Sequence, residues 1–202
     1  MPSLVKQLAS VLVDKPANSQ TEVFIRCRAA DALADLGREA APAIPALRRT
    51  LVVPVTVDCG LVLRVAAAAA LWRASGHWSL AIPFLTWALK DEYWGVAPRA
   101  VEILAEIRHA AVVPDLIRLA ERRIANGPFH FEAFGNAQSQ PLLAALAGAI
   151  GHCGRIRSDG PSYSSEAFVM LSKLAAVDDE AVRDAAVRAQ ALLRDHPERP
   201  GS

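Results

Sequence analysis

The chain has few cysteines, and their spacing argues against a disulfide framework. Among its 202 residues are only Cys27, Cys59 and Cys153, which are an odd number, lie far apart and form no CxxC pair. Small extracellular domains held together by disulfides usually have an even number of cysteines at close spacing. We therefore expect reduced thiols, as in a cytosolic protein.

The sequence also lacks an excess of charge and a long apolar segment. It has 21 acidic and 22 basic side chains, and a net charge near +1 argues against binding nucleic acid through bulk charge alone. The first 14 residues contain no long apolar stretch of the signal-peptide kind. The alanine-rich run 65–71 is far too short to span a bilayer. A cytoplasmic protein without a membrane partner is expected.

Motifs of nucleotide binding are missing as well. There is no Walker loop and no GxGxxG pattern. Gly148, Gly151 and Gly154 lie three residues apart, but they fall in an alanine-rich predicted helix and its exit, with no strand before them. This arrangement does not predict a phosphate-binding loop, and we expect no cofactor.

The histidines do not predict a metal site. His77, His109 and His152 are expected in turns between paired helices, and neighbouring helices pack about 8–10 Å apart. Metal ligands need bonds of about 2 Å, so turn or capping roles are favoured. Cys153 follows His152 in a predicted loop, and sequence neighbours on a loop do not define a nucleophile and its base. We interpret Cys153 as an ordinary loop thiol and the chain as non-enzymatic.

Helical spacing is the strongest positive signal. Between residues 25 and 51, apolar residues recur at the period of an α-helix, stop at Gly37 and resume after Pro42 and Pro45. Glycine is common just beyond a helix end, and proline is tolerated at a helix start because the first amides lack helical partners. The stretch therefore predicts two helices joined by a tight turn.

The same two-helix pattern returns at a constant offset. Leu71 follows Leu33 by 38 residues, and Leu85 follows Leu47 by 38 residues (71 − 33 = 85 − 47 = 38). A fixed offset through two helices and a turn indicates a helical repeat. Weaker copies follow, in which Leu116 and Leu171 align with Leu47. A loop near 126–139 with Phe129, Phe131 and Phe134 separates the third copy from the fourth.

The motif residues resemble the HEAT-repeat family, specifically the bacterial HEAT-like or PBS-lyase type. They are Ile25-Arg26, Ala29-Ala30, Ala32-Leu33, Leu36-Gly37 and Ala43-Ile44-Pro45-Ala46-Leu47. The resemblance implies an all-α protein, a right-handed α-α superhelix of about ten helices. It implies one domain over 1–202, with a cap at 3–13, repeats near 20–53, 61–90, 94–125 and 140–176, and a cap at 178–194.

A surface is the best candidate for function. Two residues after each of the four aligned leucines, the second helices have Arg49, Trp87, Arg118 and Lys173, with Arg48 and Arg122 close by. The resemblance implies that second helices line a concave face, so these side chains would form a ladder along one groove. Cations around an exposed tryptophan suit an acidic protein segment or a phosphate backbone. The alternative is a solvated charged face, with Trp87 partly buried against Phe84.

We therefore predict a non-enzymatic scaffold that binds a partner protein, with an acidic segment as the candidate ligand, through its concave face. One alternative is a nucleic-acid-binding protein similar to the HEAT-like alkylpurine DNA glycosylases, with Trp87 and Asp115 in the roles of the aromatic and acidic residues. The motif of that family is not matched. The other alternative is a modifying protein similar to the HEAT-like bilin lyases, whose resemblance extends only to the generic repeat residues.

Overall fold

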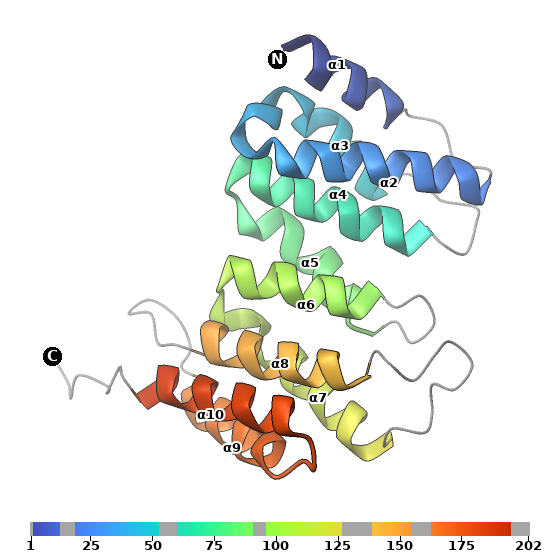
Figure 1. The fold of residues 1–202 in the computed structure, drawn as a ribbon. Coiled ribbons are helices and arrows are strands. Elements are labelled where there is room, and N and C mark those ends of the chain that lie inside the picture. Colours follow the sequence, from blue (N-terminus) through green and yellow to red (C-terminus); the bar gives the residue numbers. More distant parts are fainter. Residues whose placement is uncertain are drawn as a thin grey trace, which may run out of the picture. The chain divides into compact units, whose positions relative to one another are not determined.

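The computed structural model describes residues 2–12, 19–52, 60–90, 96–126, 139–154 and 163–194. Every regular element in these ranges is a helix, which confirms the all-α class (Figure 1). The N-terminal α-helices are α1 (Pro2–Val11), α2 (Gln20–Asp35), α3 (Ile44–Val52), α4 (Gly60–Ser75) and α5 (Trp78–Ala88). They are followed by α6 (Val96–Ile107), α7 (Val113–Asn126), α8 (Ser139–Cys153), α9 (Ser164–Ala175) and α10 (Glu180–Arg194).

The chain forms two compact units, residues 1–100 and residues 101–202. Two 3₁₀ helices, η1 (Gly37–Ala43) and η2 (Ala110–Val112), precede α3 and α7. The predictions for Cys59 and for the three-phenylalanine segment 129–134 lie outside the described residues.

Helix ends follow the predicted chemistry. Ser19 precedes α2, and its hydroxyl oxygen accepts a hydrogen bond from the amide of Glu22 at 3.1 Å, as expected of an N-cap. Gly37 and Gly76 have φ angles of +55° and +71° just beyond the ends of α2 and α4. The corresponding residue after α6 is Arg108, whose φ of 53° is unusual for a side-chain-bearing residue. The turn geometry therefore recurs even where glycine is absent.

The first unit is built around α4. Side chains 65–71 are all buried, including the five alanines 66–70. α4 packs against α2, α3, η1 and α5, and in Figure 1 it lies beside α2. A helix that is apolar all round belongs in an interior, and alanine lets neighbours approach on several sides without gaps. This arrangement explains why the sequence of α4 has no polar face.

In the second unit, α10 packs along α8 and also against α9. Gly151 permits this close approach, because a Cβ placed on it would lie 2.6 Å from the Cβ and 2.9 Å from the Cα of Ala189. Gly154 is also closed in, with the Cβ of Ala167 at 3.1 Å from a Cβ placed on it. By contrast, nothing lies within 4 Å of such an atom at Gly148. Two of the three spaced glycines therefore serve helix packing.

Several predicted boundaries are wrong. The second helix of the first repeat is split into η1, which contains Pro42, and α3, which begins at Ile44. The spacing of the second repeat predicts its second helix over 81–90, but α5 begins at Trp78, so Pro83 lies inside the helix, where its missing amide removes one helical hydrogen bond. In the fourth repeat the sequence predicts a first helix over 141–150, but α8 continues to Cys153. Glycine at 151 costs only backbone entropy, so it did not end the helix.

Candidate functional site

The second helices bury the aligned leucines and expose the residues two positions later. Leu47 and Leu85 in the first unit, and Leu116 and Leu171 in the second, have no exposed surface. The predicted surface residues Arg49, Trp87, Arg118 and Lys173 are all exposed. The alignment of the weaker third and fourth repeats therefore predicts burial correctly. A single surface holding residues of both units stays a prediction.

In the first unit the second helices carry only positive charge. Arg48 and Arg49 of α3 and Lys90, just beyond α5, are exposed. Neither 44–52 nor 78–90 contains an aspartate or a glutamate. The Nε–H of Arg49 donates to the carbonyl oxygen of Pro45 at 3.3 Å, one turn earlier in α3. This surface can therefore attract an acidic group without a competing carboxylate on its own helices.

Trp87 lies beneath an arginine of a first helix. The residue is 46% exposed, and the Arg64 guanidinium carbon lies 5.4 Å from the centroid of its ring. This distance is typical of a cation–π contact. The sequence predicted burial against Phe84 as the alternative for Trp87 and did not predict the contact with Arg64.

In the second unit the surface carries both signs of charge. Arg118 forms an ion pair with Asp115 of the same helix. The Nζ of Lys173 in α9 lies 3.3 Å from Oε1 of Glu121 in α7. Arg122 is half-buried. The cations of this unit therefore have carboxylate partners, one from the same helix and one from a neighbouring helix. Exposed pairs of this kind contribute at most about 1 kcal/mol each.

Asp115, the acidic residue considered for a glycosylase-like role, already has a partner in its own helix. Asp115 accepts from Arg118, and it belongs to the second unit, whereas Trp87 belongs to the first.

The histidines have structural roles in two cases. His109 precedes η2, and its Nδ1 accepts from the amide of Ala111 at 3.2 Å, which confirms a capping role. His152 was expected in a turn but lies inside α8, where its Nδ1–H donates to the carbonyl oxygen of Gly148 at 2.7 Å. Within the described ranges no group of three or more histidine, cysteine, aspartate or glutamate side chains could hold a metal ion.

Cys153 is the last residue of α8 and is buried, so its interpretation as a loop thiol is wrong. Its Sγ–H donates to the carbonyl oxygen of Leu104 at 3.4 Å. Burial raises the pKa of this thiol from 9.0 to about 12, although a hydrogen bond from the His109 backbone and the charge of Arg108 act in the opposite direction. The nucleophilic form of cysteine is the thiolate, so the raised pKa makes this thiol unreactive.

We expect Cys153 to resist iodoacetamide in the folded protein at pH 8, because a thiol with a pKa of about 12 is ionised to only about one part in 10⁴. Peptide mapping by mass spectrometry measures the modification, and the unfolded chain in guanidinium is the control. The folded pKa exceeds the unfolded value, so the stability that this group contributes is present below pH 9 and is lost as pH rises toward 12. Modification at the rate of the unfolded chain would contradict a buried neutral thiol.

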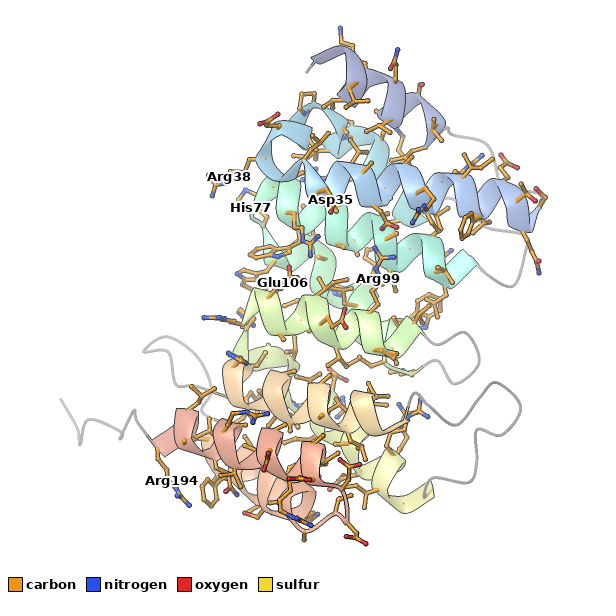
Figure 2. The ribbon with its side chains drawn as sticks, in the orientation of Figure 1. Asp35, Arg38, His77, Arg99, Glu106 and Arg194 are labelled. Atoms are coloured by element: carbon orange, nitrogen blue, oxygen red, sulfur yellow. The ribbon has the colours of Figure 1, made fainter. Side chains whose placement is uncertain are left out.

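Two charged contacts link helices elsewhere. Arg99 at the start of α6, labelled in Figure 2, forms an ion pair with Asp31 of α2, within the first unit. Arg194 at the end of α10 lies over the ring of Phe168, with its guanidinium carbon 5.1 Å from the centroid. Each contact joins residues far apart in sequence and contributes to packing of its own unit.

None of the helices in the described ranges combines the length and the apolar composition needed to cross a membrane. Comparison with protein-family models and with curated proteins gave no match.

Proposed function

We propose that the chain is a HEAT-like repeat protein, a right-handed α-α superhelix of four helix pairs with a capping helix at each end. The constant offset of 38 residues between the first two pairs supports this. The shared burial of Leu33 with Leu71 and of Leu47 with Leu85 supports it further, since all four side chains are fully inside.

As its function, the protein is a non-enzymatic cytoplasmic scaffold that binds a partner protein through its second helices. The observation that carries this proposal is the alternation in α3 and α5, in which a buried leucine is followed two residues later by Arg49 or Trp87. Exposed tryptophan and arginine are the residues most often found at binding hot spots. The absence of acidic residues from 44–52 and 78–90 favours a partner with an acidic segment.

Photo-crosslinking tests this function in the cells from which the protein comes. A benzoylphenylalanine placed at Arg49 or Lys173, in second helices, is expected to capture the same partner. The matched control positions are Arg28 of α2 and Arg188 of α10, which are exposed on other helices. Equal capture from all four positions, or from none, would contradict binding through the second helices.

With the captured partner in hand, Arg49→Glu is expected to weaken binding by about tenfold, because it places like charges in contact. Arg118→Glu is expected to weaken binding less, since Arg118 already pairs with Asp115. Arg28→Glu is the control. A nucleic-acid ligand would instead be identified by an affinity that falls steeply with salt.

A further inference from the structure

Arg64 occupies the place in α4 that Arg26 occupies in α2, since 64 − 26 = 38, the offset of the repeat. Arg26 is buried, and its Nη2 lies 2.5 Å from Oε1 of Glu22, one turn earlier in α2. The residue equivalent to Glu22 in the second repeat is Gly60 (22 + 38 = 60). The second repeat therefore keeps the arginine and lacks the carboxylate.

The consequence is visible at Arg64. Its Nε is buried and has no hydrogen-bond partner in the described part of the chain. A buried donor without an acceptor is costly, and more so when it is charged. The guanidinium lies over the ring of Trp87, 5.4 Å from the centroid. A cation–π contact uses the face of the guanidinium, whereas its five N–H donors point outward in its plane. The stacked arginine can therefore still donate hydrogen bonds to a carboxylate that lies at the edge of the guanidinium.

We propose that Arg64 and Trp87 form a binding site for a glutamate or aspartate side chain of the partner protein. The incoming carboxylate pairs with the in-plane N–H donors of the Arg64 guanidinium, as Glu22 pairs with Nη2 of Arg26, and it so compensates a charged group whose Nε lacks an acceptor among the described residues. A negative charge at this position is also favoured by the helix dipole, because the first turn of α4 begins at Gly60. Arg48 and Arg49 supply further positive charge on the second helices of the same unit. This inference rests on the proposed function and names the chemistry that the partner must present.

NMR can test the site without knowledge of the partner. The probe is a capped peptide of four glutamates, with a capped peptide of four glutamines as its matched control. On titration into the ¹⁵N-labelled protein at physiological salt, the glutamate peptide is expected to shift the Arg64 Nε–H and Trp87 indole N–H resonances, and the glutamine peptide is not. Arg64→Gln is expected to weaken binding of the glutamate peptide by about tenfold.

A second variant supplies the missing carboxylate within the chain. Gly60→Glu recreates the spacing of Glu22 and Arg26, so it is expected to shift the Arg64 Nε–H resonance without peptide and to weaken peptide binding about tenfold through competition. Gly60→Gln has the same shape without the charge and is expected to retain more of the binding. Unchanged peptide affinity in Arg64→Gln overturns the site, as does a shift of the same resonances by a DNA duplex but not by the glutamate peptide.

Failure of this site and failure of the proposed function give different results. If a partner is captured at Arg49 and Lys173 but binds Arg64→Gln with full affinity, the second-helix surface stands and the carboxylate site does not. If the glutamate peptide shifts the Arg64 resonance but no partner is captured at second-helix positions, the site stands and the scaffold function does not.

Discussion

Replacing Gly151 with alanine is expected to lower the free energy of unfolding by about 1–3 kcal/mol. The added Cβ would lie 2.6 Å from the Cβ and 2.9 Å from the Cα of Ala189, so α10 has to move away from α8. Alanine would otherwise be favoured over glycine in a helix by about 1 kcal/mol, and the clash outweighs this gain because the obstacle includes backbone. Urea unfolding followed by circular dichroism measures the change.

Gly148→Ala is the matched control in the same helix. Nothing lies within 4 Å of a Cβ at Gly148, so this substitution is expected to raise the free energy of unfolding by about 0.5–1 kcal/mol. Adding Ala189→Gly to Gly151→Ala is expected to recover part of the loss by removing one of the clashing atoms. If both alanine substitutions stabilise the protein, α8 and α10 do not approach as closely as the structure indicates.

Leu85→Ala is expected to have the larger effect, a loss of about 2–5 kcal/mol in the free energy of unfolding. Leu85 is fully buried in α5, and α5 packs against the central helix α4. Truncation leaves a cavity that the alanine-rich surface of α4 cannot fill, because methyl side chains cannot change rotamer to reach into it. Denaturant unfolding with intrinsic tryptophan fluorescence measures the loss.

The aligned residues Leu47 and Arg49 provide the comparison for Leu85. Leu47→Ala is expected to cost a similar amount, since Leu47 is equally buried in α3. Arg49→Ala, two residues later in the same helix, is expected to change stability by no more than about 0.5 kcal/mol because the side chain is exposed. A large cost at Arg49 together with a small cost at Leu47 would show that the register of α3 is wrong.

The mixed charge of the second unit changes what can be expected of a partner. Lys173 and Arg118 both lie near carboxylates of α7, so an acidic ligand would have to displace existing ion pairs there. The second helices of the first unit have no such competition within 44–52 and 78–90. We therefore expect residues 1–100 to contribute most of the affinity for an acidic segment.

Much of the fold could be predicted from periodicity. The repeat alignment places Leu116 and Leu171 with Leu47, and all three are buried as predicted. The alignment succeeded because a buried leucine at the same place in each second helix is a pattern that can be read from the local sequence. The exposure of Arg49 and Trp87 followed from the same reasoning, since a residue two positions after a buried one faces another side of the helix.

The contacts between helices could not be predicted in the same way. Gly151 and Ala189 are 38 positions apart in sequence, and nothing near either residue records their contact. The predicted position of Cys153 in a loop was wrong, because a helix continues through glycine when packing compensates for the loss of backbone entropy. The contact of Arg64 with Trp87 was not predicted, although glycine at position 60, where the first repeat has Glu22, was a signal in the sequence that Arg64 lacks the carboxylate of its equivalent Arg26.

The sequence by itself determined the all-α class, the alignment of the four leucines and the turn at Gly37, because these depend on neighbours within one or two helical turns. Only the tertiary structure decided that Trp87 lies under Arg64, that Glu121 of α7 pairs with Lys173 of α9, and that Cys153 is an inert interior thiol. These properties depend on which side chains meet across helices and on how much water they lose there, and neither is encoded in the local pattern of residues.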